Sequence, residues 1–181
     1  MGGSLSTERW RYRIDRARIK ERERQVKIYN LLTQDMILLD IEADSRDDVL
    51  MEMVGFLKKR ERITKGKDLF EKLIKREELG STAIGEGVAI PHCKLKSVKN
   101  PIVLLAVSRR GVDFYALDGK PSHLFFLVVS SPDNPSLNLQ ILAAIAHLVR
   151  KAKPLLDRVL KAQSVGMILE TVRDEEDKIN E

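Results

Sequence analysis

Two unbroken apolar runs limit the folds open to this chain more than any other feature. Residues 102–107 read Ile-Val-Leu-Leu-Ala-Val, and residues 124–129 read Leu-Phe-Phe-Leu-Val-Val. Each run has the length of a strand that is buried on both faces. A sheet with such strands at its centre must be covered by helices on both faces. The sequence therefore predicts an α/β fold.

Segments before these runs alternate between strand and helix signals. A short apolar strand is expected at residues 36–41, followed by a helix whose N-cap is Asp44 or Ser45. A second helix is expected over residues 67–78, and it ends at Gly80. Residues 80–92 are rich in glycine and apolar residues, which indicates two short strands around a turn.

The later part of the chain reads as an edge segment and then helices. Residues 111–119 predict an edge segment with a loop, and the turn cluster 130–135 leads into an amphipathic helix. Pro154 opens a shorter helix, and Ser164 caps another that reaches Val172.

The net charge of +5 is confined to the N-terminal part of the 181-residue chain. Residues 1–30 hold nine Lys or Arg and four Asp or Glu, a difference of five. We expect a basic helical extension over 1–30, a compact domain over 31–173, and an acidic tail over 174–181 that frays. The extension, with Trp10 and Ile14, is a candidate dimer element. A helix that is solvated or packs on a partner is favoured there over a nucleic-acid-binding helix. The segment has no base-stacking aromatics and no recognisable nucleic-acid-binding motif.

Cysteine and histidine usage argues against a metal centre. The one cysteine, Cys93, excludes an internal disulfide and fits a cytoplasmic location. A zinc site from Cys93 with His92, His123 and His147 matches no zinc-binding spacing. We therefore expect no metal. No apolar run approaches the roughly 20 residues of a membrane span, and the polar N-terminus does not resemble a secretory signal.

The segment Gly-Glu-Gly-Val-Ala-Ile-Pro-His at residues 85–92 carries the strongest chemical signal. Pro91 restrains the backbone just before His92, a side chain that titrates near neutral pH. Gly85 and Gly87 permit positive φ and close backbone approach, so their amides could point at phosphate oxygens. A neutral, oriented imidazole is the nucleophile that phosphoryl transfer to nitrogen requires.

Further donors precede this segment. Arg76 could supply a planar fork for two phosphate oxygens, and the Ser81 and Thr82 hydroxyls could add more donors. On the residues alone, a proline-histidine pair at such a junction is more often a partly buried structural histidine.

The stretch Arg-Glu-Glu-Leu-Gly-Ser-Thr-Ala-Ile-Gly-Glu-Gly-Val-Ala-Ile-Pro-His, residues 76–92, resembles a family signature. It is similar to the signature of enzyme IIA domains of the mannitol/fructose class. These domains belong to the bacterial phosphoenolpyruvate-dependent phosphotransferase system, and nitrogen-regulatory IIA proteins share the signature. The resemblance covers residues 31–172 and includes Asp113-Phe114-x-Ala116-x-Asp118, the strand at Leu124 and the helix after Asn138.

The resemblance implies a fold and a chemistry. The implied fold is a mixed β-sheet flanked by helices on both faces, here with an extra N-terminal helix. His92 would be phosphorylated by a histidine-containing phosphocarrier protein, with Arg76 beside it, and would pass the group to a IIB domain or signal to a regulatory target. No cofactor is implied, because the phosphoryl group arrives on a protein histidine.

One departure from the family pattern bears on function. A second histidine is usual in the pattern His-Leu-x-x-Leu, where this chain has Asn138-Leu-Gln. An amide donates hydrogen bonds but carries no charge and shuttles no proton. Two hypotheses therefore stand: a phosphocarrier and regulator, or a non-phosphorylated interaction module with the same fold. Cys93 stands where glycine is common, and a small filler is favoured over a reactive thiol.

Within the first hypothesis, regulation is favoured over sugar transport, because the chain shows no IIB segment and no membrane span. The residues leave open which protein is the target and whether the carrier counts as an enzyme.

Overall fold

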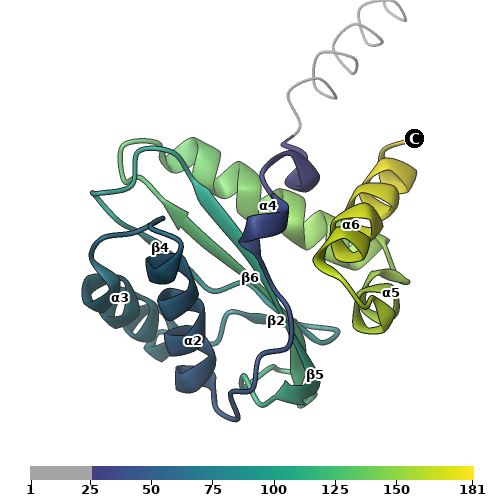
Figure 1. Ribbon diagram of the computed structural model, residues 1–181, viewed down its shortest axis with the longest axis horizontal. Helices are drawn as coiled ribbons and strands as arrows, with labels where there is room; N and C mark the ends of the chain where they lie inside the picture. Colours follow the sequence, from purple (N-terminus) through teal and green to yellow (C-terminus); the bar gives the residue numbers. More distant parts are fainter. Residues whose placement is uncertain (1–25) are drawn as a thin grey trace, which may run out of the picture.

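The computed structural model describes residues 26–181, which form one mixed sheet with helices on both of its faces (Figure 1). The strands are β1 (Ile37–Leu38), β2 (Ala83–Gly85), β3 (Val88–Ala89), β4 (His92–Lys94), β5 (Ile102–Val112) and β6 (Ser122–Ser130). The helices are α2 (Arg46–Lys59), α3 (Gly66–Glu78), α4 (Pro135–Lys151), α5 (Leu155–Lys161) and α6 (Val165–Asn180), with 3₁₀ turns η1 (Ile28–Asn30) and η2 (Gln34–Met36).

The two apolar runs become the central strands, as predicted. β5 and β6 pair antiparallel, with Leu104 opposite Leu127. The sheet order is β1-β5-β6-β3-β2, and β4 also pairs with β6. β1 runs parallel to β5, and β3 and β4 run parallel to β6, whereas β2 runs antiparallel to β3. The sheet is therefore mixed, and this expectation is confirmed.

Alternate residues of the central strands enter two separate cores. On one face, Leu105 and Phe126 pack with residues of α4, α5, α6 and η1. On the other face, Leu104 and Phe125 pack with residues of α2 and α3. Figure 1 shows α2 and α3 apart from α4, α5 and α6, with the sheet between them. The unbroken apolar sequence of each strand follows from burial on both sides.

Helix caps lie where side-chain oxygens can accept a backbone N–H. Ser45 accepts from Asp48, and Ser164 accepts from Met167. Asn134 accepts from the amide of Leu137, and Pro135 follows at the first position of α4, where no N–H is needed. Of the two caps predicted before α2, Asp44 and Ser45, the structure uses Ser45, and the cap predicted at Ser164 is confirmed.

The C-terminal residues differ from the expected frayed tail. α6 continues to Asn180, and Glu175 and Glu176 are both only 3% exposed. Glu176 accepts the backbone N–H groups of Ile28 at 2.7 Å and Tyr29 at 3.0 Å. Glu176 thus caps the first described turn, and Glu175 is held by Arg158 and Lys178. Composition alone does not reveal the tertiary contact of Glu176.

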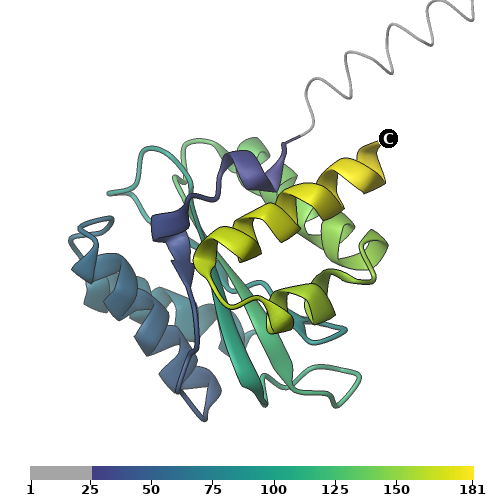
Figure 2. The ribbon, with the colours of Figure 1, turned by 45° about the vertical axis from the view of Figure 1, so that its right-hand side comes forward.

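The beginning of the compact domain differs as well. Ile28 is fully buried, and η1 lies beside α6, as Figure 2 shows. The basic helical extension predicted over residues 1–30 thus gives way to packed 3₁₀ structure from Ile28 onward. The rest of that expected helix, with Trp10 and Ile14, lies outside the described residues. Within residues 26–181, no helix has the length and apolarity to cross a membrane.

Candidate functional site

The strand beside β6 is interrupted at Pro91, and this interruption presents His92. β3 and β4 keep one register along β6, because Val88 lies opposite Leu124 and His92 lies opposite Val128. Pro91 has no N–H to donate, but its carbonyl accepts from Val128 at 2.9 Å. The pairing therefore resumes directly at His92.

The His92 ring is held in one orientation. Its Nδ1 lies 2.7 Å from the carbonyl oxygen of Ile90, which can only accept a hydrogen bond. Nδ1 therefore carries the proton, and Nε2 keeps its lone pair as an acceptor. Burial lowers the pKa of His92, and the positive charge of Arg76 lowers it further. The hydrogen bond to Ile90 acts in the opposite direction and raises the pKa. The ring is accordingly neutral around pH 7.

Arg76 reaches the same ring from the last turn of α3. Its Nε donates to Nε2 of His92 at 3.3 Å, and its Nη1 donates to the Gly80 carbonyl at 3.0 Å. Gly80 follows the end of α3, so the chain that leaves the helix fixes the guanidinium group. The arrangement places a cation against the nitrogen that bears the lone pair.

Asn138 completes the site from α4. Its side chain is buried, and its Oδ1 accepts from the Ser130 hydroxyl at 3.0 Å. That bond leaves the Nδ2 amide as the end of the side chain able to donate to a group on His92. The three residues share a surface hollow of about 380 Å³, lined by Lys72, Lys75, Arg76, Leu79, His92, Cys93, Lys94 and Asn138.

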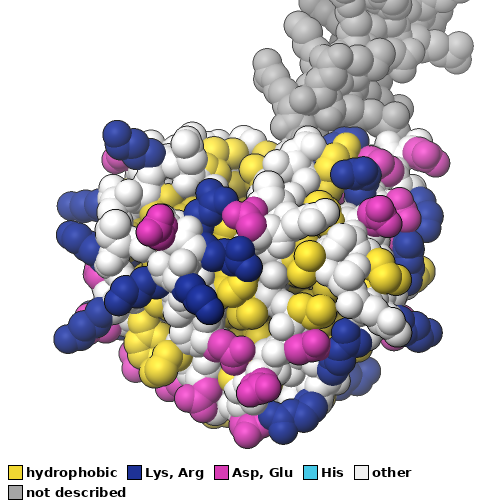
Figure 3. Space-filling model, viewed as in Figure 1, with side chains coloured by type: hydrophobic (Ala, Val, Ile, Leu, Met, Phe, Trp, Pro, Cys, Tyr) yellow, Lys and Arg dark blue, Asp and Glu magenta, His cyan; other side chains and the backbone are white. Residues whose placement is uncertain are grey.

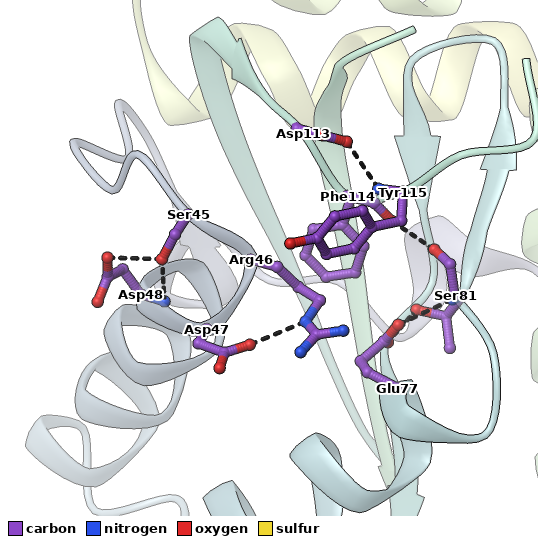
Figure 4. A network of polar contacts seen from close by, with 10 residues as sticks. Ser45, Arg46, Asp47, Asp48, Glu77, Ser81, Asp113, Phe114 and Tyr115 are labelled. Carbon is purple, nitrogen blue, oxygen red and sulfur yellow. Dashed lines mark hydrogen bonds and ion pairs between the residues drawn. The ribbon is translucent and has the colours of Figure 1, made fainter. Parts of the chain in front are cut away.

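Ser81 and Thr82 have other partners (Figure 4). The Thr82 amide donates to buried Glu77 at 2.9 Å, and its hydroxyl donates to the same carboxylate. The Ser81 hydroxyl donates to the carbonyl of Phe114 and accepts from the Ala83 amide. Both hydroxyls are thus engaged in holding the turn after α3, and neither lines the hollow.

Gly85 and Gly87 also lie away from the hollow. Both have the positive φ that the sequence predicts, +83° and +77°. The amide between them, that of Glu86, donates to Asp118 at 3.0 Å. A side chain on Gly87 would meet Leu156 and His123, so the glycine allows close packing rather than contact with His92.

Several residues of the site were not singled out from the sequence. Glu77 is buried and holds Thr82, and Lys72, Lys75 and Lys94 line the hollow. Lys72, Lys75, Arg76 and Leu79 recur at helical spacings of three and four, the signal that could have placed them on one face of α3.

Cys93 lines the hollow without the character of a reactive thiol. Burial raises its pKa to about 12, so it is protonated at neutral pH. His123 binds the Ser108 carbonyl through Nδ1 at 2.9 Å, which is a structural contact away from the hollow. Among residues 26–181, no three His, Cys, Asp or Glu side chains gather around one point where a metal ion could bind.

The fold and the hollow define an α/β protein that presents a neutral histidine beside an arginine. A family model described as "Phosphoenolpyruvate-dependent sugar phosphotransferase system, EIIA 2" matches residues 30–175. The chain therefore belongs to this family, and the resemblance seen in residues 76–92 is confirmed.

The chain has relatives of two kinds, sugar-specific components and nitrogen regulatory proteins. The chain is 35% identical over 147 residues to the PTS system fructose-specific EIIABC component of Bacillus subtilis, covering 81% of this chain but only 23% of that protein. It is 30% identical over 149 residues to the nitrogen regulatory protein of Pseudomonas aeruginosa, covering 82% of this chain and 96% of that protein.

A solved structure carries the same fold. The nitrogen regulatory protein IIA-Ntr of Neisseria meningitidis superposes with a TM-score of 0.69 and 29% sequence identity. The superposition covers 80% of this chain and 98% of that one. Family and relatives together support a phosphocarrier or regulatory IIA role for this chain.

Proposed function

We propose that this protein is a phosphocarrier of the IIA type that accepts a phosphoryl group on Nε2 of His92. One observation carries the proposal: the Ile90 carbonyl binds Nδ1 of the ring, while Nε2 lies against Arg76 in an open hollow. The nucleophilic nitrogen is thus neutral, oriented and next to a cation.

The transfer step follows from this geometry. The lone pair of Nε2 forms the new N–P bond, and the N–P bond of the donor phosphohistidine breaks with its electron pair returning to the donor ring. The His92 ring becomes cationic, and its Nδ1–H remains bonded to the Ile90 carbonyl, which stabilises that charge. Arg76 moves from Nε2 to the phosphoryl oxygens, which its fork can bind in pairs.

Asn138 takes the place of the usual second histidine as a neutral donor. Its amide can bind one phosphoryl oxygen, but it adds no charge to the site. We therefore expect transfer to depend on Arg76 more than on Asn138.

The partners follow from the family and the relatives. The donor is a histidine-containing phosphocarrier protein, and the acceptor is a IIB domain or a regulatory target protein. The match to this chain covers nearly the whole length of the nitrogen regulatory relatives, and this similarity favours a regulatory target as the partner. The cytoplasmic location stays a prediction.

Intact mass spectrometry tests the proposal. The protein is incubated with phosphoenolpyruvate, enzyme I and the histidine phosphocarrier, beside the variants His92→Ala and His123→Ala. We expect an acid-labile gain of one phosphoryl group in the wild type and in His123→Ala, and none in His92→Ala. If the folded wild type gains nothing while a control IIA is phosphorylated by the same mixture, the non-phosphorylated interaction module replaces this proposal.

A further inference from the structure

A second cavity, of about 370 Å³, opens between the corner from α4 to α5 and the end of the sheet. One wall comes from Val149 and residues within 152–157, and the other from residues within 86–88 and 120–123. Small-molecule sites usually have volumes of roughly 300–1,000 Å³, so this cavity has the size of a site for a small ligand. It shares no lining residue with the hollow around His92, and the chemistry proposed for His92 makes no use of it.

Two contacts fix the separation of the cavity walls. At the exposed mouth, Nζ of Lys153 lies 2.6 Å from Oε1 of Glu86, an ion pair that joins the two walls. In the interior, a Cβ atom added to Gly87 would lie 2.8 Å from a methyl carbon of Leu156, so this side chain already packs on the glycine backbone. Gly87 has a φ of +77°, and its carbonyl accepts two amides at the start of β6, at 2.7 and 3.1 Å. The cavity is therefore formed before a ligand enters, which reduces the entropic cost of binding.

The inner lining of the cavity is aliphatic. Val88, Ala152 and Leu155 are each at most 3% exposed, and Val149 is 6% exposed. His123 contributes its ring to the sheet-side wall. No Phe, Tyr or Trp of the described residues lines the cavity. An aliphatic group that enters would be removed from water against these side chains, which is the main favourable contribution to its binding.

The charged groups of the lining cancel. Two cations and two carboxylates are present, Lys120 and Lys153 with Glu86 and Asp157. Lys153 and Glu86 neutralise each other in the ion pair at the mouth. Lys120, on the sheet side, and Asp157, on the helix side, form no ion pair with any residue of the described range 26–181. The nearby carboxylate of Asp118 accepts the backbone amides of Glu86 and Lys120 instead. One cation and one carboxylate are thus available to a ligand, on opposite walls.

Charge by itself does not mark this place as a site. Charged side chains of both signs are spread over the face of the molecule that Figure 3 shows, with apolar side chains between them. Lys120 and Asp157 differ from such surface charges because they stand on two walls of one aliphatic cavity. A complementary ligand carries both charges and an aliphatic body, whereas a phosphate or another net anion does not match a lining with zero net charge.

We propose that this cavity binds an aliphatic α-amino acid. The carboxylate of the ligand lies at Lys120, its ammonium group lies at Asp157, and its side chain packs on the aliphatic lining. The site is separate from the hollow around His92, and the inference does not depend on phosphoryl transfer. Because partly exposed ion pairs contribute little, the dissociation constant is expected to be about 1 mM.

The test is an NMR titration of the ¹⁵N-labelled full chain with L-leucine, up to about 20 mM. Three further probes each lack one part of leucine: isocaproate lacks the ammonium group, isoamylamine lacks the carboxylate, and glycine lacks the aliphatic side chain. The variants are Lys120→Met and Asp157→Asn. Lys99→Met and Glu170→Gln are the matched controls, because both positions are exposed and lie outside the cavity lining.

We expect leucine to shift the amide signals within residues 86–88 and 152–157 and to leave those of residues 76–79 and 92–94 unchanged. Each of Lys120→Met and Asp157→Asn should weaken leucine binding by about two- to fivefold, the effect of losing one partly exposed ion pair. Asp157→Asn should then bind leucine no better than isocaproate, and Lys120→Met should bind it no better than isoamylamine. The two control variants should bind leucine as the wild type does.

Four results would overturn the amino-acid site. Leucine could shift no signal from the two walls, or shift the signals around His92 instead. Glycine could bind the wild type as tightly as leucine, which would remove the aliphatic lining from the site. Isocaproate and isoamylamine could both bind the wild type as tightly as leucine, which would remove the two charges. The control variants could lose as much affinity as the variants of the lining. None of these results bears on the phosphorylation of His92, which mass spectrometry decides separately.

Discussion

At the scale of single residues, the site depends on one carbonyl group. Pro91 interrupts the strand, and the Ile90 carbonyl then binds the His92 ring at 2.7 Å. The sequence indicated that Arg76 and His92 are neighbours because residues 76–92 match a specific family signature, and it added Asn138 only because this residue stands where the family usually has its second histidine. It could not assign Ser81 and Thr82 correctly to their partners, since Glu77 and the Phe114 carbonyl reach them only in the folded chain.

The depressed pKa of His92 predicts how the ring titrates. Burial makes the protonated form unfavourable, so the NMR titration of the His92 ring should give a midpoint below the ordinary 6.5. As the pH falls below 6.5, the unfolded chain takes up the proton first, so this residue lowers the free energy of unfolding in that range. The effect is absent above pH 6.5 and complete below the folded pKa. A midpoint at or above 6.5 would contradict the buried, neutral ring.

The raised pKa of Cys93 predicts a slow thiol. With a pKa of about 12, almost no thiolate exists at pH 7.5 to attack iodoacetamide. Alkylation of the native protein, followed by intact mass, should be slower by at least about a hundredfold than in the urea-unfolded chain. Similar rates in the two states would show that the thiol is ionised and accessible.

At the scale of elements, apolar periodicity and N-cap residues predicted the helices correctly, whereas the acidic composition of the C-terminal segment did not predict its structure. Ser45, Ser164 and the run 67–78 located three helices, because caps and apolar stripes are local signals. The frayed tail predicted over residues 174–181 is instead part of α6, because the contacts that order it are not local in sequence. The partners of Glu176, the amides of Ile28 and Tyr29, lie almost 150 residues away in the sequence.

The contact between α6 and η1 predicts a cost for Glu176→Ala. The change leaves the buried N–H of Ile28 without an acceptor, a loss of about 1–3 kcal/mol in the free energy of unfolding. Urea denaturation measures it, with Glu170→Ala, an exposed position on the same helix, as the matched control. The control should stay within about 0.5 kcal/mol of the wild type. Equal values for both variants would mean that the cap contributes nothing.

At the scale of the whole molecule, the two cores share β5 and β6. Leu104 and Leu105 are adjacent yet belong to opposite cores, so neither core can lose its packing without affecting the sheet. The fold class was predictable because two apolar runs require cover on both faces. The strand order was not, since pairings such as β1 with β5 join distant segments.

The shared strands predict cooperative unfolding of residues 26–181. NMR signals from α2 and from α6 should disappear at the same urea concentration as the far-UV circular dichroism changes. Amides of β5 and β6 should exchange most slowly with solvent, because both faces of these strands are buried. Separate midpoints for α2 and α6 would show that the two layers unfold independently.

The most direct test of the phosphocarrier account is NMR of the ¹⁵N-labelled histidine rings after phosphorylation. The geometry predicts phosphorus on Nε2 of His92, with Nδ1 still protonated and bonded to the Ile90 carbonyl. Phosphorus on Nδ1, on another residue, or on none would contradict it.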